Sequence, residues 1–258
     1  MDTILLTIEN NIATITLNRP DKFNAFNRTM ALALQNAIAN CQTDNNVKAI
    51  VITGAGKAFS AGQDIAELVG EAKMEMNKIL SEHYNPIVTA IKNCTKPIIA
   101  KVNGVAAGAG ANIALCCDVV VATYSASFIQ AFSKIGLIPD SGGTYTLPRL
   151  IGWQKASAIM LLGDKIIATE ADTMGMIYKA YPDEVFDAEC TNIATKLAQL
   201  PSVGLALTKQ ALQQSYTNSW QQQLQTEDTL QQQAAATYDY NEGITAFLEK
   251  RKPVFIGK

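Results

Sequence analysis

The sequence predicts an α/β fold, and three observations point to it. First, short apolar segments that are typical of buried strands alternate with segments of helical periodicity. Second, residues 4–9 and 12–17 alternate apolar and polar side chains on either side of Asn10-Asn11, which indicates a β-hairpin. Third, 48% of the 258 residues are hydrophobic, which is enough for a sizeable core. We therefore expect one large α/β domain over residues 1–200.

The other elements of this domain follow the same patterns. A polar break at residues 18–22 ends the hairpin, and strands and helices then alternate. Each of the first two buried strands leads directly into a loop of small residues. The expected strands are 49–53, 98–102 and 119–122, and the expected helices are 30–38 and 112–117.

The composition changes after residue 200. Residues 205–214 are apolar on one helical face, and a glutamine-rich stretch follows at 221–233. Glutamine is a fair helix former, and Leu224 and Leu230 fall at spacings that fit one apolar stripe. We therefore expect an all-helical region over residues 201–258 that packs on the core or on another subunit.

The charge balance excludes some classes of function. The chain has 21 basic and 23 acidic residues, a net charge of −2, which argues against a nucleic-acid-binding protein. The N-terminus lacks the pattern of a signal peptide. No apolar run could span a membrane, since the longest is interrupted by Lys101 and Asn103. We expect a cytoplasmic protein with neither a membrane nor a nucleic-acid partner.

Cysteine and histidine contribute little to the expected chemistry. The five cysteines have no metal-binding spacing, so we expect buried free thiols and no metal site. His83 is the single histidine, and a solvated structural role on a helix is expected for it. The chemistry must then come from carboxylates, hydroxyls or backbone groups.

Two small-residue loops, 58–64 and 103–111, each follow a buried strand. Small residues let a ligand approach the backbone, and unpaired amides at a turn or helix N-terminus can donate to an oxyanion. The alternative for each loop is tight packing against a neighbour. Together they predict a two-amide oxyanion hole.

Asp140 follows Pro139 and precedes a glycine pair at 142–143. This pattern is typical of a helix N-cap, and it also suits a general base. The two roles are compatible, because a helix N-terminus would keep a carboxylate ionised.

Three segments, 59–64, 96–110 and 135–144, resemble the signature of the crotonase (enoyl-CoA hydratase/isomerase) family. Residues 17–25 and 247–253 match the same family, so the likeness runs from about residue 4 to the C-terminus. It implies a ββα spiral core with a helical C-terminal region. Within the family, the sequence is most similar to the type that converts ring-epoxidised phenylacetyl-CoA to oxepin-CoA.

The resemblance also implies roles for individual residues. The oxyanion hole would be the backbone amides of Ala61 and Ala109, and the substrate would be an acyl-CoA thioester. Coenzyme A is then part of the substrate, and no separate cofactor is expected. The CoA moiety would be lined by Ala25, Gln63, Asp64 and Ile65, with Lys22 and Lys250 approaching its phosphates, Lys250 across a subunit boundary.

The departures from the family pattern favour an isomerase. The two glutamates with which hydratases activate water would fall at Asn112 and Phe132, and neither is a carboxylate. Asp140 remains and matches the acidic residue of the isomerase type. A hydratase, a thioester hydrolase, and a CoA-thioester-binding or nucleic-acid-binding protein without catalysis stay open. The family likeness implies a homotrimer or a dimer of trimers, built through the C-terminal region.

Overall fold

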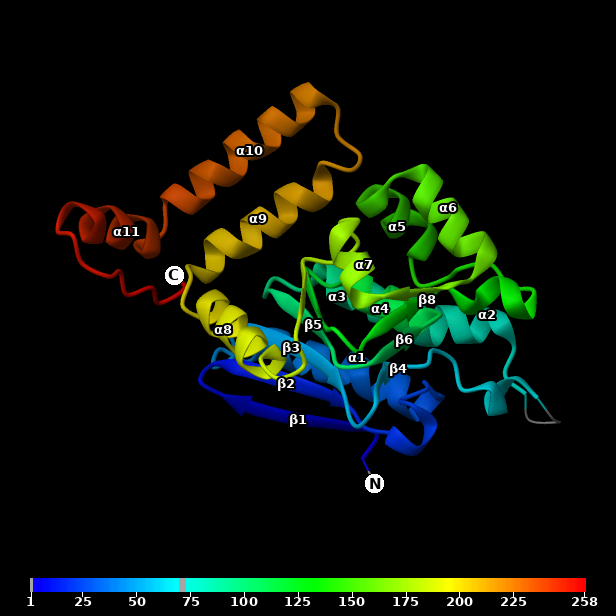
Figure 1. Cartoon of the computed structure of the whole chain (residues 1–258). Helices are drawn as coiled ribbons and strands as arrows, with labels where there is room; N and C mark the ends of the chain where they lie inside the picture. Colours follow the sequence, from blue (N-terminus) through cyan, green and yellow to red (C-terminus); the bar gives the residue numbers. More distant parts are fainter. Residues whose placement is uncertain (1, 70–72) are drawn as a thin grey trace.

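The computed structural model describes residues 2–69 and 73–258, and its core is built on two sheets (Figure 1). The strands are β1 (Ile4–Glu9), β2 (Ile12–Leu17), β3 (Ala49–Gly54), β4 (Ala58–Ser60), β5 (Ile98–Val102), β6 (Val105–Ala107), β7 (Val119–Thr123), β8 (Ser127–Ile129), β9 (Lys165–Ile167) and β10 (Lys179–Tyr181). The larger sheet has the order β1-β2-β3-β5-β7-β10, and the smaller has the order β4-β6-β8-β9. Except for β1–β2 and β8–β9, all neighbouring strands run parallel.

Helical segments connect the strands. The α-helices of the core are α1 (Arg28–Thr43), α2 (Met76–Lys78), α3 (Asn85–Asn93), α4 (Ala109–Cys116), α5 (Gly143–Ile151), α6 (Trp153–Leu162), α7 (Ala168–Thr173) and α8 (Phe186–Ala198). Three short 3-10 segments, η1 (Pro20–Lys22), η2 (Ile65–Leu68) and η4 (Ala131–Ile135), and a π-helical segment, η3 (Ile79–Tyr84), complete it.

The connection pattern repeats. A strand of the larger sheet is followed at once by a strand of the smaller sheet and then by helical structure, in β3-β4, β5-β6 and β7-β8. This arrangement is the expected ββα spiral, and the α/β class is confirmed. Since each pair of strands turns at the same edge, the loops after β4 and β6 lie next to each other.

Hydrophobic periodicity explains where the elements form. In β2 the inward residues Ala13, Ile15 and Leu17 are fully buried and alternate with half-buried ones. Helix α8 buries Phe186 and Cys190 against the other face of the larger sheet. Burying one such aliphatic or aromatic side chain contributes roughly 1.5–3 kcal/mol.

Most of the expected elements are confirmed, with shifts at their ends. The hairpin has the expected strands, and Asn10 and Asn11 both have the positive φ that such a turn needs. Helix α4 begins at Ala109 rather than at 112. All five cysteines are buried free thiols, as expected.

The expectation for His83 is wrong, because this side chain is fully buried in η3 instead of being solvated. Its Nε2 lies 3.3 Å from Arg28 Nη1. Burial in this environment lowers the pKa of His83.

The C-terminal helices form an arm that projects from the core (Figure 1). The arm comprises α9 (Ser202–Gln214), α10 (Trp220–Ala235), α11 (Tyr238–Leu248) and the following tail, within the region expected at 201–258. The glutamine-rich stretch is helical, as expected, and begins with a capping box of Ser219 and Gln222. No helix in the described part of the chain is long and apolar enough to cross a membrane.

Candidate active site

A cavity of 170 Å³ lies where the loops after β4 and β6 meet η3 and η4. Its wall is mostly apolar and includes Ile65, Phe132 and Leu137. Backbone and polar groups reach it from Ala61, Gln63, Tyr84, Ala109 and Asp140. The predicted loops and the predicted acid, far apart in sequence, therefore share one cavity.

The backbone N–H of Gln63 faces this cavity. Residues 62–64 pair with Phe26 as a short parallel bridge, in which Phe26 N–H donates to Gly62 O (2.6 Å) and Asp64 N–H donates to Phe26 O (2.8 Å). The C=O and N–H of a trans peptide point in opposite directions. Because Gly62 O points at Phe26, the Gln63 N–H points away from it, and it has no partner among the described residues.

The backbone N–H of Ala109 is the second unpaired donor. Ala109 is the first residue of α4, and Gly108 O accepts from Asn112 N–H (3.2 Å) inside the helix. The Ala109 N–H therefore points out of the helix N-terminus, where the first amides have no helical acceptor. It also has no partner within the described ranges.

Close backbone packing holds these two amides together. Gly62 has φ +86°, and a Cβ built on it would lie 2.8 Å from Ala107 O and 3.3 Å from Ala109 N. A Cβ on Gly110 would lie 2.6 Å from Ser60 O. Glycine is therefore required at both positions, since any side chain would force the two loops apart.

The expected donor at Ala61 must be corrected. Ala61 lines the cavity, but its N–H already donates to Phe23 O at 2.9 Å. The unpaired amide of this loop lies two residues later, at Gln63. The sequence alone could not separate the two, because the pairing depends on a segment almost forty positions away.

Asp140 supplies the carboxylate that the sequence predicted at this cavity. It does not cap α5: the N-cap is Gly142, without a side-chain cap. Ser141 Oγ donates to Asp140 Oδ1 at 2.8 Å. The helix was expected to keep the carboxyl ionised, but burial raises the pKa of Asp140, and the Ser141 hydrogen bond offsets this only in part.

Asn112 and Phe132 have structural roles around this carboxylate. Asn112 is buried, donates from Nδ2 to Asp140 O (2.9 Å) and accepts at Oδ1 from Gln130 Nε2 (2.7 Å). Both polar atoms of its side-chain amide are therefore hydrogen-bonded, and the bond from Nδ2 holds the loop that carries Asp140. Phe132 is buried and forms part of the apolar wall, near Gly108.

The structure brings together only some of the residues expected to line CoA. Gln63 and Ile65 border the cavity. Asp64 instead binds Arg19 (2.8 Å) and caps η2; burial would raise its pKa, but Arg19 outweighs this and lowers it. Ala25 and the exposed Lys22 lie beside this segment, outside the cavity lining.

Lys250 is far from the cavity within one chain. It follows α11, which lies at the opposite end of the molecule from α2, and α2 contributes Met76 to the cavity wall (Figure 1). Within one chain, Lys250 does not reach this site.

Tyr84 is a residue of the cavity that was not predicted from the sequence. This residue is buried on η3, lines the cavity, and donates from Oη to Gln63 Oε1 at 2.9 Å. Burial raises the pKa of Tyr84 well above its usual value, and nearby carboxylates add to the effect. The Asn85-Pro86 pair that follows is a sequence signal of an irregular helix at this point, since proline disturbs helical hydrogen bonding.

Comparisons with known proteins identify the family. The family model described as "Enoyl-CoA hydratase/isomerase" matches residues 7–258. The chain belongs to the enoyl-CoA hydratase/isomerase family. It is 42% identical, over 100% of both chains, to the 1,2-epoxyphenylacetyl-CoA isomerase of Escherichia coli K12.

Other members of this family carry the hydratase name. The chain is 43% identical to a "Probable enoyl-CoA hydratase" of Rhodobacter capsulatus, over 99% of this chain and 98% of that one. The crystal structure of an enoyl-CoA hydratase from Bacillus anthracis is similar with a TM-score of 0.92 and 31% identity, covering 99% of this chain and 100% of that one. Family membership thus gives an acyl-CoA thioester as the substrate class. It does not decide between isomerisation and hydration, for which the residues of the site must be considered.

Proposed function

We propose that this enzyme is an acyl-CoA isomerase that stabilises a thioester enolate. The observation that carries this proposal is the pair of unpaired amides, Gln63 N–H and Ala109 N–H, facing an apolar cavity with one lining carboxylate among the described residues, Asp140. Two preorganised donors can accept the charge that develops on a thioester oxygen when an alpha proton leaves.

In the proposed reaction the thioester oxygen accepts both amide hydrogen bonds. Asp140 takes the alpha proton, and the electron pair moves to the carbonyl oxygen as the enolate. Asp140 then returns the proton at the gamma carbon, which shifts the double bond by one position and leaves the composition of the substrate unchanged. The raised pKa of Asp140 suits a group that must both accept and return a proton.

The acyl group of the E. coli relative suggests a second substrate. With a ring-epoxidised phenylacetyl-CoA, the same donors would stabilise the enolate while the epoxide opens and the ring expands to oxepin-CoA. The apolar wall formed by Phe132 and Leu137 supports this proposal, because it accommodates an aromatic ring and keeps water away from it.

A hydratase is the alternative, and the site argues against it. Water activation needs a base beside the cavity at the positions where hydratases of the family carry glutamates. Here Asn112 is an amide hydrogen-bonded at both Nδ2 and Oδ1, and Phe132 is apolar. Neither side chain can take a proton from water.

Product analysis tests the proposal. Purified protein is incubated with 3-enoyl-CoA, crotonyl-CoA and ring-epoxidised phenylacetyl-CoA in deuterated water, and the products are identified by chromatography and mass spectrometry. We expect isomers that carry exchanged deuterium. A product heavier than its substrate by one water, or release of free CoA, would instead identify a hydratase or a thioester hydrolase.

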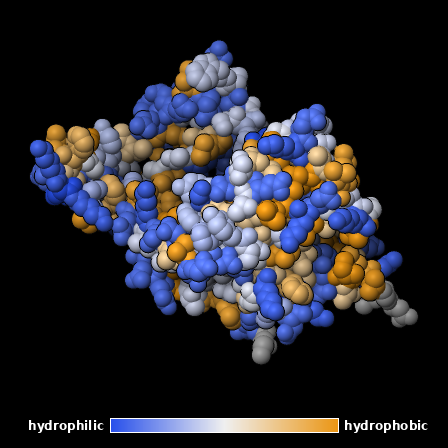
Figure 2. All heavy atoms as spheres, in the orientation of Figure 1, coloured by the Kyte–Doolittle hydropathy of each residue, from blue (hydrophilic) through white to orange (hydrophobic). Residues whose placement is uncertain are grey.

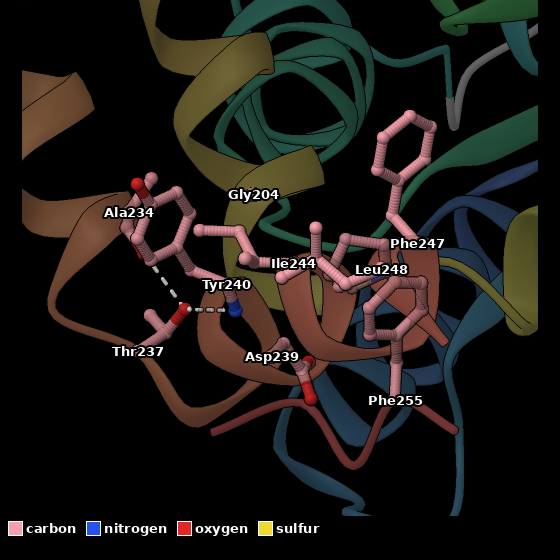
Figure 3. Close-up of a pocket in the computed structure, with 11 residues that line it drawn as sticks. Gly204, Ala234, Thr237, Asp239, Tyr240, Ile244, Phe247, Leu248 and Phe255 are labelled. Carbon is pink, nitrogen blue, oxygen red and sulfur yellow. Dashed lines mark hydrogen bonds between the residues drawn. The ribbon is translucent and has the colours of Figure 1, made fainter. Parts of the chain in front are cut away.

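We further propose that the enzyme assembles as a homotrimer or a dimer of trimers through the arm. The arm leaves large apolar side chains uncovered, and α11 and its neighbours border an open groove of 490 Å³ lined by Ile244, Phe247, Leu248 and Phe255 (Figure 3). A second copy that covers this surface would also bring its own Lys250 toward a neighbouring CoA site.

A further inference from the structure

The side chain of Gln63 is held at both ends of its amide. Tyr84 Oη donates to Gln63 Oε1 at 2.9 Å, and Gln63 Nε2 donates to Glu67 Oε2 at 3.0 Å. The same Nε2 lies 3.3 Å from Asp64 O. Both polar ends of this side chain are therefore engaged, and it cannot rotate without breaking at least one of these bonds.

Glu67 is itself fixed by a helix end. Its other oxygen, Oε1, accepts from the backbone N–H of Arg28 at 2.8 Å, and Arg28 is the first residue of α1. A carboxylate at a helix N-terminus is stabilised by the unpaired amides and the helix dipole. One carboxylate thus joins Gln63 to the end of α1.

Tyr84 lies at the end of the π-helical segment η3, and it contacts the end of the Gln63 amide that Glu67 does not contact. Asn85 N–H bonds to Leu80 O, five residues back, as a π-turn requires. Pro86 has no N–H for the carbonyl of Glu82, and Gln35 Nε2 donates to that oxygen instead, at 2.8 Å. The wider turn is therefore stabilised from outside the helix.

The phenol ring is fixed as firmly as its hydroxyl. Tyr84 is 1% exposed, and its ring packs edge-on against Phe26 with a centroid distance of 6.0 Å. Phe26 also forms the backbone bridge that orients residues 62–64. The Tyr84 hydroxyl donates its one proton in the hydrogen bond to Gln63 Oε1, so it is not available to a substrate oxygen.

We infer that Tyr84 and Glu67 are positioning residues, which clamp the side chain of Gln63 and so fix the direction of its backbone N–H toward the thioester oxygen. The inference rests on the proposed function, because it assumes that this amide is an oxyanion donor. A donor acts in catalysis only if it already points where charge develops, and the clamp supplies that preorganisation. Neither side chain needs to touch the reacting atoms.

The inference predicts a specific pattern of kinetic effects. Tyr84→Phe keeps the ring and its packing but releases Gln63 Oε1. We expect kcat to fall about tenfold, less than the roughly 10²–10³ for a complete loss of one donor, with a smaller change in KM. Gln63→Ala keeps the backbone N–H and removes the whole clamp, so it should lose at least as much.

A double-mutant cycle tests the mechanism directly. If Tyr84 acts only through Gln63, adding Tyr84→Phe to Gln63→Ala should cause no further loss, because the group that it holds is already gone. Tyr124→Phe, which removes an exposed phenol outside the cavity, is the control and should match the parent enzyme. Thermal unfolding of each variant monitors folding.

A spectroscopic measurement reports on the donors without turnover. A cinnamoyl-CoA thioester absorbs at longer wavelength when its carbonyl is polarised, and binding to the parent enzyme should produce this shift. The shift should shrink in Tyr84→Phe and in Gln63→Ala. The inference is overturned if Tyr84→Phe keeps the full shift and kcat, or if its loss persists undiminished in the Gln63→Ala background. Absence of the shift in a parent enzyme that also turns over no thioester would overturn the proposed function, and the inference with it.

Discussion

The core and the arm of this enzyme bury their apolar residues very differently. Helix α4 in the core has every residue buried, whereas α9 in the arm has none and α10 buries Leu230 alone. Figure 2 shows apolar side chains on the arm interspersed among polar ones. The helices of the arm therefore bury far less of their apolar surface within one chain than α4 of the core does.

The two regions are also held by different forces. The core contains a continuous cluster of buried apolar residues. Helix α9 contacts the core through polar groups: Lys209 Nζ donates to Asp118 Oδ2 (2.6 Å) and to Lys96 O (2.9 Å). Such contacts fix a direction but contribute little net stability. If the proposed function and assembly are correct, the chemistry belongs to the core and the assembly to the arm, and variants in the two regions should have different effects.

The largest effect is expected from Asp140→Asn in the core. The variant keeps the shape of the side chain but cannot accept a proton, so turnover should fall by at least ~10². Binding of CoA thioesters, measured by calorimetry, and the oligomeric state should stay unchanged. A fully active variant would show that another group is the base.

Phe247→Asp in the arm is expected to weaken assembly, which Asp140→Asn leaves unchanged. Phe247 is 82% exposed in a single chain, so the charge should not destabilise the isolated fold. If a second copy covers it, the loss of a buried aromatic contact costs at least ~2 kcal/mol, roughly 30-fold in the assembly constant. Light scattering should then detect smaller species, and KM for CoA thioesters should rise.

Trp153→Asp is the matched control for this variant. Trp153 is 74% exposed and lies on α6, in the core, rather than on the arm. If both variants assemble like the parent enzyme, the arm is not the assembly region, and the division between the two regions fails.

A smaller, local effect is expected from Ser219→Ala. Ser219 forms the capping box of α10, and replacing such a cap costs about 1 kcal/mol. Because α10 is held by few buried contacts, the loss should appear as local opening, with amide exchange about fivefold faster in α10 only. Equal acceleration in α4 would mean that arm and core unfold together.

The smallest expected effect is a shift of the pH dependence of kcat/KM. Since burial raises the pKa of Asp140, kcat/KM should fall as the pH drops through that raised value and the base becomes protonated. Ser141→Gly removes a hydrogen bond that lowers this pKa, and glycine suits the φ of +52° at this position. The acid limb should move to higher pH with the plateau unchanged, and an unmoved limb would assign it to another group.

The fold was predictable because its signals are local. The alternation in residues 4–17 and the helical periodicity among the glutamines each depend on neighbours within a strand or a turn. The hairpin and the helix that they predict are confirmed, whereas only Leu230 of the expected stripe is buried and Leu224 is 46% exposed. Helix ends were harder: α4 begins at Ala109 because Gly108, with φ +52°, starts the helix, and no hydrophobic spacing records this.

The site was predictable only to the level of its loops. The backbone N–H of Ala61 is hydrogen-bonded and that of Gln63 is not. This difference depends on contacts with Phe23 and Phe26, which lie in a distant segment of the sequence. Tyr84 reaches the cavity because Pro86 and Gln35 together stabilise a π-turn. Such long-range pairings leave no periodic trace in one sequence.

The close approach at Gly62 and Gly110 also restricts how this scaffold can diverge. Any Cβ at these two positions would strike the opposite loop, at 2.8 Å from Ala107 O or 2.6 Å from Ser60 O, so substitution there destroys the donor pair rather than altering it. Phe132 lines the cavity with its side chain, and the side chain of Asn112 donates to the backbone carbonyl of Asp140, so exchanging either side chain leaves the backbone donors in place. A descendant of this enzyme can therefore change the side chains around the cavity while it keeps the same pair of unpaired backbone amides.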